Sequence, residues 1–306
     1  MINFLIFVIV CYLITYSAIP FLSKYIFDAP KERSSHNVSK PTAGGLVFAC
    51  LISLIAYLNK DFLPLLCLPL SIIGLIDDKF DLEPFIRLSA QIFTVILLFN
   101  ISPLNNIILN SFSGFTYLLI LFSIIFLSTG CINFINFTDG LDGLLAGCMI
   151  IIFGSISIYL DLNYWPYVAC LLGFIVLNWH PSKIFMGDVG STFLGSVFVG
   201  VILQMGSFTE ALKILLLASP LLGDALISVS KRLLSGESII IPHKSFYFKR
   251  LNEGKFSHDQ VSMIYMLATF LICMCLLFGN LYWMIGVIIL ELITLLYLEK
   301  KFAIQI

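Results

Sequence analysis

The sequence predicts an all-α integral membrane protein with about eleven transmembrane helices, and three observations support this fold class. Hydrophobic residues make up 59% of the 306-residue chain, and its mean hydropathy is +1.03. Charged residues make up only 11%, less than half of the roughly 25% that is usual in soluble domains. The apolar residues are gathered into stretches that can cross a bilayer as helices, because lipid offers backbone N–H and C=O groups no other partners.

The apolar stretches run the length of the chain, so we expect one polytopic membrane domain over residues 1–306. The first stretch has no basic start and no small-residue cleavage site, which predicts a retained helix rather than a signal peptide. The eleven stretches cover residues 2–22, 44–59, 62–76, 86–104, 114–132, 143–160, 163–179, 190–206, 210–230, 261–279 and 281–298.

Lysine and arginine predict the orientation, because the cytoplasmic loops of membrane proteins are enriched in both. When the gaps between the stretches are numbered alternately, one set contains only Lys60 and Lys213 out of the 17 Lys and Arg residues. The other set is therefore expected to be cytoplasmic, with the N-terminus outside and the C-terminus inside. The cytoplasmic loops are expected at about 23–43, 77–85, 133–142, 180–189 and 231–260.

The first polar motif is the adjacent pair Asp77-Asp78 at the end of the third stretch. Two neighbouring carboxylates repel each other unless a proton or a cation lies between them. A divalent cation, which prefers oxygen ligands, is one explanation, and the other carboxylate is then left to act as a base. A solvated helix end is the alternative explanation.

The second motif places Asn133, Asn136, Asp139 and Asp142 at intervals of three residues within an apolar run. Residues three apart are neighbours on one face of a helix. Their amide and carboxylate groups together offer the donors and acceptors that a nucleotide or a sugar needs. A polar contact between two helices is the alternative.

Two further motifs are Gly187-Asp188, which opens the eighth stretch, and a basic segment that follows Asp224. An Asp beside Gly at a helix N-terminus suits a hard cation or a phosphate. The basic segment suits a diphosphate, or it reflects only the usual positive charge of cytoplasmic loops. It contains Lys231, Arg232, His243, Lys244, Lys249 and Arg250.

The four motifs together predict one kind of chemistry at one membrane surface. Charged side chains at the boundary of a bilayer are costly and usually mark function. Carboxylates for a metal ion, cations for phosphate oxygens and a positioned nucleophile are the parts that phosphoryl transfer requires. A site at the lipid boundary further indicates a lipid phosphate as one substrate.

These motifs resemble those of the polyprenyl-phosphate N-acetylhexosamine-1-phosphate transferases, which form glycosyltransferase family 4. The resemblance rests on Asp77-Asp78, on the run from Asn133 to Gly143, on 186–191 and on 41–45, and it covers about residues 20–260. It implies a Mg²⁺-dependent reaction, with Mn²⁺ as an alternative ion. The reaction moves a sugar 1-phosphate from a UDP-N-acetylhexosamine to undecaprenyl phosphate, or another polyprenyl phosphate, and releases UMP.

The resemblance also implies roles, partners and a location. Asp188 is expected to bind Mg²⁺ with support from Asp78, and Asp77 and Asp78 are expected to be catalytic, with Asp77 as the base. The expected location is a bacterial inner membrane, where such enzymes initiate O-antigen, capsule or other cell-envelope polysaccharides. We expect no nucleic-acid partner, and a homodimer is left open. The residues expected to bind substrates are Lys40, Asn133, Asn136, Asp139, Asp142, Gly187, His243, Lys244 and Arg250.

The last cytoplasmic loop departs from the family pattern. The branch that carries muramoyl-pentapeptide has three consecutive histidines there, whereas this chain has His243-Lys244-Ser245-Phe246. The loop is more similar to the branch that initiates O-antigen and capsule, although Phe246 lies where that branch often has a second histidine. N-acetylglucosamine, N-acetylfucosamine and N-acetylquinovosamine remain open as the sugar. A transporter or flippase for lipid-linked or nucleotide sugars, and a catalytically dead scaffold, are the alternative functions.

Overall fold

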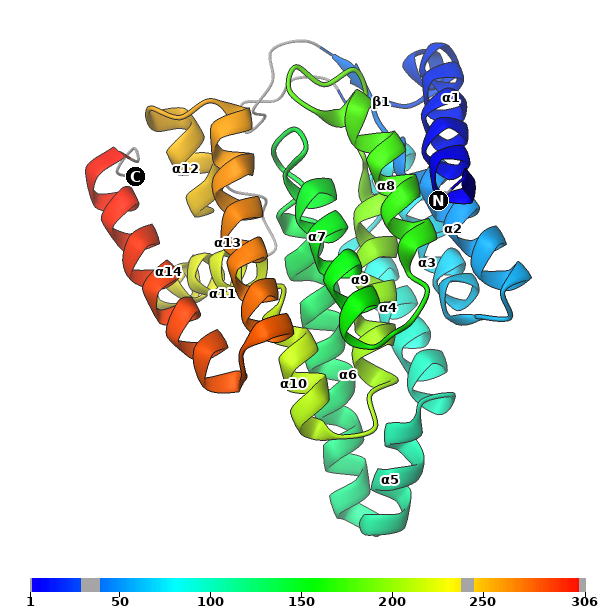
Figure 1. The fold of residues 1–306 in the computed structure, drawn as a ribbon, viewed down its shortest axis with the longest axis vertical. Helices are drawn as coiled ribbons and strands as arrows, with labels where there is room; N and C mark the ends of the chain where they lie inside the picture. Colours follow the sequence, from blue (N-terminus) through cyan, green and yellow to red (C-terminus); the bar gives the residue numbers. More distant parts are fainter. Residues whose placement is uncertain (1, 29–38, 238–244, 303–306) are drawn as a thin grey trace.

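The computed structural model describes residues 2–28, 39–237 and 245–302, and nearly all of this part of the chain is helical (Figure 1). The all-α fold class is therefore confirmed. The helices are α1 (Ile2–Tyr25), α2 (Gly45–Leu58), α3 (Leu63–Phe80), α4 (Pro84–Asn100), α5 (Pro103–Ser111), α6 (Gly114–Phe137), α7 (Leu144–Tyr159), α8 (Trp165–Asn178), α9 (Asp188–Leu203), α10 (Phe208–Leu216), α11 (Ser219–Leu234), α12 (Tyr247–Gly254), α13 (His258–Phe278) and α14 (Leu281–Phe302).

Each of the eleven apolar stretches forms one helix or one bent pair of helices. The stretch 86–104 covers most of α4 and the start of α5, and these two helices meet at a bend of 77°. The stretch 210–230 covers most of α10 and α11, which meet at a bend of 80°. Pro103 and Pro220 lie in the first turn of α5 and α11, where proline is tolerated because the N–H that it lacks has no helical partner.

Helix length divides the apolar helices into two groups. Four of the described helices are long and apolar enough to cross a membrane, and up to six spans result when each bent pair is counted as one. Helices α2, α7, α8 and α9 are apolar but contain only 14 to 16 residues. At 1.5 Å per residue they are about 21–24 Å long, shorter than the roughly 30 Å of a bilayer core. The chain is thus a multi-pass, all-α membrane protein.

Two elements differ from the expectation that polar segments are loops. Helix α12 lies within 231–260, and it is stable there because Tyr247, Phe248 and Leu251 are buried while its other face is polar. A short antiparallel ribbon pairs β1 (Phe27–Asp28) with β2 (Lys40–Pro41). Helices α3 and α6 also continue into the expected loops 77–85 and 133–142.

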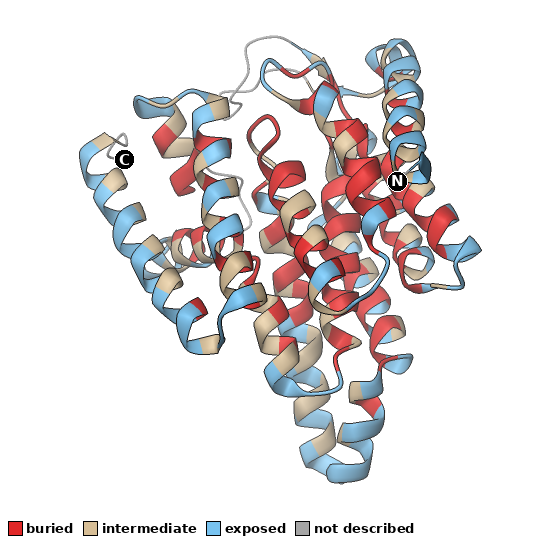
Figure 2. Ribbon diagram, in the orientation of Figure 1, coloured by how far each residue is buried: buried red, intermediate tan, exposed pale blue. Residues whose placement is uncertain are grey.

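Helix α9 lies at the centre of the fold, where almost every one of its residues is buried (Figure 2). It packs against α2, α3, α4 and α6. Glycines let its first turn approach these neighbours closely: a Cβ on Gly74 of α3 would lie 2.6 Å from the carbonyl oxygen of Asp188, and one on Gly45 of α2 would lie 2.6 Å from the Gly190 nitrogen. Contacts of this kind through small residues are typical of helices packed in membranes.

Helices α11 to α14 form a second group beside this central bundle (Figure 1). Helix α13 joins the two groups because it packs against α7 on one side and against α11 and α14 on the other. Helix α14 lies at the edge of the molecule, and Met284 is its one buried residue in the described part of the chain.

Candidate active site

Asp77 and Asp188, which are far apart in the sequence, share one cation in the structure. Nη1 of Arg87 donates to Oδ2 of Asp77 at 2.9 Å and lies 3.6 Å from Oδ2 of Asp188. The other oxygen of Asp77 accepts from the Leu82 N–H at 2.7 Å. The predicted meeting of the first and third motifs is therefore observed. Arg87, one of the positive charges expected to be cytoplasmic, was not among the expected site residues, yet it lies between these two carboxylates.

Asp78 is bonded to the start of α9. Its Oδ1 accepts from the Asp188 N–H at 2.9 Å, and its Oδ2 accepts from the Val189 N–H at 3.4 Å. Gly187 precedes this turn with φ at 75°, and a Cβ on it would collide with Asp78 Oδ2. Gly187, expected to bind substrate, therefore has a conformational reason to be glycine, and Asp78 satisfies backbone N–H groups that α9 itself cannot.

Asn133 and Asn136 both lie on the last turns of α6, and each is bonded to another helix. Asn133 and Gln91 of α4 exchange two side-chain hydrogen bonds, at 2.9 and 2.6 Å. Asn136 Oδ1 accepts from the Ser191 hydroxyl of α9 at 2.6 Å. The polar contact between helices, given above as the alternative, thus describes both residues, although both also line the cavity described below.

A second cluster of polar side chains, which includes Lys40, surrounds the carboxylate of Asp142. This carboxylate accepts from the Ser182 N–H at 3.1 Å and from the Ser182 hydroxyl at 2.8 Å. Nζ of Lys40 donates to the same hydroxyl at 2.8 Å and lies 3.6 Å from the carboxylate. Two histidines complete the cluster, with Nδ1 of His180 at 3.0 Å and Nδ1 of His258 at 3.8 Å from Asp142 Oδ2. Neither histidine was among the expected site residues.

Asp139 and Asp142 are held in opposite protonation states by their surroundings. Burial, and then the charges of Asp188 and Asp142, raise the pKa of Asp139 to about 8. Burial also disfavours the charged form of Asp142, but the hydrogen bonds from Ser182 and His180 and the charge of Lys40 outweigh it and lower its pKa. Asp142 is therefore ionised at neutral pH, whereas Asp139 retains a proton.

The fourth motif is divided by the structure. Asp224 is buried and accepts from the Tyr247 and Phe248 N–H groups at 2.8 and 3.1 Å, which ties the start of α12 to α11. On α12, Arg250 pairs with Glu299 of α14. Lys249, also on α12, lies beside Gly140 of the second motif, because its Cε is 2.9 Å from where a Cβ on Gly140 would be.

His243 and Lys244, both expected to bind substrate, lie outside the described residues. Phe246, in which the loop departs from the family pattern, is buried and stacks on Phe248 with ring centroids 5.5 Å apart. It also packs against Phe137 at the end of α6. This position is thus an apolar contact between α6 and α12 in this protein.

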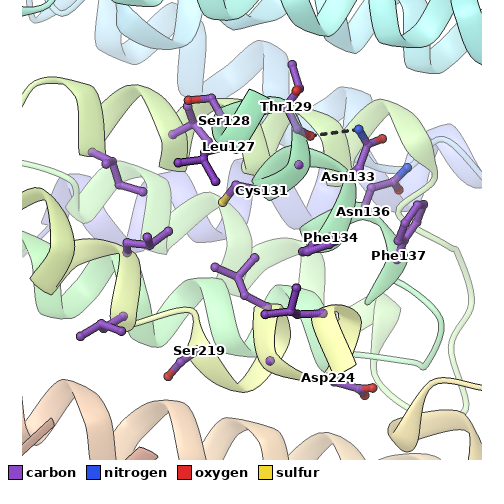
Figure 3. Close-up of a pocket in the computed structure, with 18 of the residues that line it drawn as sticks. Leu127, Ser128, Thr129, Cys131, Asn133, Phe134, Asn136, Phe137, Ser219 and Asp224 are labelled. Carbon is purple, nitrogen blue, oxygen red and sulfur yellow. Dashed lines mark hydrogen bonds between the residues drawn. The ribbon is translucent and has the colours of Figure 1, made fainter. Parts of the chain in front are cut away.

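An apolar cavity of about 2550 Å³ opens beside the Asp77–Arg87–Asp188 group. Its walls come mainly from α3, α4, α5, α6, α9, α10, α11, α13 and α14, and Figure 3 shows α6 residues facing Ser219 and Asp224 of α11 across it. Its walls also include Phe126, Leu127 and Leu226, whose exposed fractions are 66%, 67% and 56%. The cavity therefore reaches the lipid-facing surface.

Comparison with known proteins places these features in a family. The sequence profile of glycosyl transferase family 4 matches residues 62–206. The probable undecaprenyl-phosphate N-acetylglucosaminyl 1-phosphate transferase of Bacillus subtilis (strain 168) is 28% identical over 78% of this chain and 74% of its own length. The undecaprenyl-phosphate alpha-N-acetylglucosaminyl 1-phosphate transferase of Yersinia pestis is 27% identical over 83% of this chain and 77% of its own length.

A third relative belongs to another branch. The phospho-N-acetylmuramoyl-pentapeptide-transferase of Anoxybacillus flavithermus (strain DSM 21510 / WK1) is 31% identical over 60% of this chain and 68% of its own length. The resemblance drawn from the sequence motifs is thus confirmed at the level of the family. This chain belongs to glycosyl transferase family 4, and it is a multi-pass membrane enzyme of the transferase class.

Proposed function

We propose that this protein transfers an N-acetylhexosamine 1-phosphate from a UDP-sugar to undecaprenyl phosphate, or to another polyprenyl phosphate, in a Mg²⁺-dependent reaction. An oxygen of the lipid phosphate forms a bond to the phosphorus that carries the sugar. The bond between the two phosphates of the donor breaks, and UMP leaves with the bridging oxygen. The products are UMP and a lipid diphosphate sugar.

The cavity is the observation that carries this proposal. Its volume of about 2550 Å³ exceeds the roughly 300–1,000 Å³ of ordinary small-molecule pockets. Its lining is mainly apolar, but it includes the charged group Asp77, Arg87 and Asp188, which we call its polar end. This combination suits a molecule with a long hydrocarbon chain and a single anionic head, which is the description of a polyprenyl phosphate.

The carboxylates at the polar end fit a magnesium site. Asp77 and Asp188 direct oxygens toward the same cation, and carboxylate oxygen is the ligand type that Mg²⁺ prefers. These contacts favour Asp77 over Asp78 as the partner of Asp188, because both oxygens of Asp78 face the backbone of α9. Bound Mg²⁺ would supply charge neutralisation for the phosphate oxygens.

The chain's own residues then have separate tasks. Arg87 holds Asp77 in place and offers guanidinium N–H groups to a phosphate at the mouth of the cavity. Asp77 accepts the proton of the lipid phosphate when that phosphate carries one. Lys249, which lines the cavity beside Gly140, adds a second positive charge to its lining.

UDP-N-acetylglucosamine is the donor that we favour. The two relatives that match 78% and 83% of this chain are both named as N-acetylglucosaminyl 1-phosphate transferases. Phe246 occupies an apolar contact in the loop where the pentapeptide branch carries histidines. The product would initiate an O-antigen, a capsule or another cell-envelope polysaccharide at the cytoplasmic face of a bacterial inner membrane.

The reaction is tested with purified protein, undecaprenyl phosphate and a panel of UDP-N-acetylhexosamines, with UMP release and labelled lipid product measured with Mg²⁺ and with a chelator. We expect activity with at least one donor and loss of it on chelation. Asp188→Asn is expected to lower the rate at least 100-fold while the protein still folds. Asp161→Asn, a substitution in an exposed turn, is the matched control and should retain activity.

Absence of UMP release with every donor would overturn the proposal. Full activity of Asp188→Asn would be compatible with the proposed reaction but would contradict the assignment of Asp188 to its site. Transporters also use broken helices, and the bent pair α10 and α11 lines the cavity. Flux of a sugar nucleotide or lipid-linked sugar into vesicles without UMP formation would therefore indicate a transporter instead.

A further inference from the structure

Helix α14 carries a carboxylic acid, Glu291, at the depth of the bilayer centre. The helix is long and apolar enough to cross a membrane, and Glu291 lies midway between its two ends, Leu281 and Phe302. At 1.5 Å per residue it is roughly 15 Å from either end, about half the thickness of a bilayer core. An ionisable side chain at that depth is costly and usually marks a binding site or a pathway.

The side chain of Glu291 faces the large apolar cavity. Val287 and Leu295, which lie one helical turn to either side of it, also line this cavity and therefore share a helix face with Glu291. The wall at this place includes Leu290 of α14 and Leu267 of α13, and both are exposed. A molecule dissolved in the bilayer can therefore reach the part of the cavity that Glu291 lines.

Two polar atoms of the cavity lining are buried and lack partners. In the described parts of the chain, no group forms a hydrogen bond with Oε1 of Glu291 or with the hydroxyl oxygen of Ser219. Ser219 is the first residue of α11 and lines the same cavity (Figure 3). A buried polar group without a partner costs free energy, so both atoms can gain from a ligand that bonds to them.

The other acidic groups of the lining are already satisfied. Among the described residues, Asp77 and Asp188 share the guanidinium of Arg87. The carboxylate of Asp224 accepts four hydrogen bonds. Glu291 is thus the acid of this lining to which the described part of the chain gives neither a cation nor a hydrogen bond, and a cationic ligand is the complement that it calls for.

The surroundings of Glu291 favour an organic cation over a metal ion. Ca²⁺ and Mg²⁺ need about six oxygen ligands, whereas the neighbouring wall on α13 and α14 is mostly aliphatic. A hydrocarbon tail suits that wall. A primary ammonium carries three N–H donors, enough to bond to the carboxylate and to a hydroxyl such as that of Ser219. Hydrogen bonds between two charged groups are the stronger ones.

We propose that Glu291 anchors a second ligand site in this cavity, which takes a lipophilic primary amine from the bilayer. The ammonium of the amine bonds to the Glu291 carboxylate, and the Ser219 hydroxyl is a further acceptor. The hydrocarbon tail lies against α13 and α14. None of the residues assigned to the transfer reaction takes part, so this site does not depend on the proposed function.

The site is tested by direct binding of radiolabelled dodecylamine to the purified protein in nanodiscs of phosphatidylglycerol and phosphatidylcholine, with empty discs subtracted. We expect saturable binding that is at least about tenfold weaker in Glu291→Gln, because a charge-assisted hydrogen bond is lost. Glu291→Asp keeps the carboxylate and should bind more tightly than Glu291→Gln. Glu210→Gln, on α10, is the matched control, since Glu210 already pairs with Lys213.

Two analogues identify the chemistry that is recognised. Dodecyltrimethylammonium keeps the charge and lacks N–H donors, whereas dodecanol keeps the chain and lacks the charge. The primary amine should bind most tightly and the alcohol most weakly. When phosphatidylethanolamine replaces phosphatidylcholine, weaker binding of dodecylamine identifies a membrane lipid as the source of the amine, and unchanged binding identifies a free amphiphile.

Thermal denaturation without amine separates binding from folding. Glu291→Gln should keep the Tm of the wild type, because Oε1 of Glu291 has no bond to lose within the described residues. A lower Tm in that variant, equal binding of dodecylamine by the variant and the wild type, or equal binding of dodecanol and dodecylamine would each overturn the inference. None of these results depends on UMP release, so the inference and the proposed function fail separately.

Discussion

At the scale of single residues, the surroundings of Asp139 couple its protonation to the stability of the fold. Burial and the charges of Asp188 and Asp142 raise its pKa to about 8, whereas an unfolded chain leaves an aspartate near 3.9. Between these two values the folded protein binds one proton more than the unfolded chain. The free energy of unfolding must therefore fall as the pH rises through this window, and the loss is complete above the folded pKa.

Asp139→Asn should remove this dependence, because the amide resembles the protonated acid and does not titrate. In the presence of a chelator, we expect the advantage of the variant over the wild type to be small near pH 5 and to grow as the pH rises to about 8. At pH 9 the variant should be more stable by at least about 1 kcal/mol, since each unit of pKa shift corresponds to about 1.4 kcal/mol. Thermal denaturation in detergent over this range measures the difference, and parallel curves would contradict the assignment.

The sequence predicted the acidic residues of the site better than their partners. Asp77, Asp78 and Asp188 could be singled out because charges at helix ends in an apolar chain stand out, although Asp78 rather than Asp77 was expected to support Asp188. Arg87 could not be assigned, because one more cytoplasmic arginine looks like a topology signal. His258 was equally hidden, since its meeting with His180 depends on how α13 packs against α7. The sequence singled out Asn133 as a polar residue in an apolar run. Its hydrogen bond to Gln91 could not be predicted, because it depends on the register with which α4 packs on α6.

At the scale of elements, the start of α9 is completed by another helix. Gly187 provides no side-chain cap, and the carboxylate of Asp78 on α3 accepts the first two N–H groups instead. A cap of this kind stabilises a helix by roughly 1 kcal/mol. Because Asp188 is the first residue of α9, the cap also fixes the carboxylate that we assign to Mg²⁺.

Substitution of the adjacent aspartates should separate capping from metal binding. Asp78→Asn retains an acceptor oxygen and should keep both the Tm and its increase on addition of Mg²⁺. Asp78→Ala should lower the metal-free Tm by a few degrees, while Asp77→Asn should keep it and lose the Mg²⁺-dependent increase. If Asp78→Asn loses that increase as fully as Asp77→Asn does, Asp78 is a metal ligand, as the sequence alone suggested.

Element boundaries were predictable where apolar length decides them and not where packing does. The eleven stretches were visible because lipid forces apolar runs to be helical. Helix α12 was not predictable, because its eight residues are too few to show as an apolar stretch. It is held by hydrogen bonds to Asp224 and by buried aromatic side chains. The two sharp bends at α5 and α11 could have been suspected from Pro103 and Pro220, but their angles depend on the neighbouring helices.

At the scale of the whole molecule, we propose eleven crossings with the N-terminus outside and the C-terminus in the cytoplasm. The uneven distribution of Lys and Arg supports this orientation. In a bacterial host, green fluorescent protein fused after the C-terminus should fluoresce, and alkaline phosphatase at the same position should be inactive. The reverse is expected of fusions in the loop at Lys60. An active phosphatase at the C-terminus would contradict the orientation and the cytoplasmic site with it.

The exposed flank of the cavity, at Phe126, Leu127 and Leu226, bears on how the two reactants arrive. A reactant that diffuses laterally within the bilayer meets the protein at a frequency set by its number per unit of membrane area. A reactant that comes from water meets it at a frequency set by ordinary molarity. The two encounter rates therefore respond to different dilutions. Added inert lipid lowers the encounter rate of the reactant in the bilayer, and added buffer lowers that of the reactant in water.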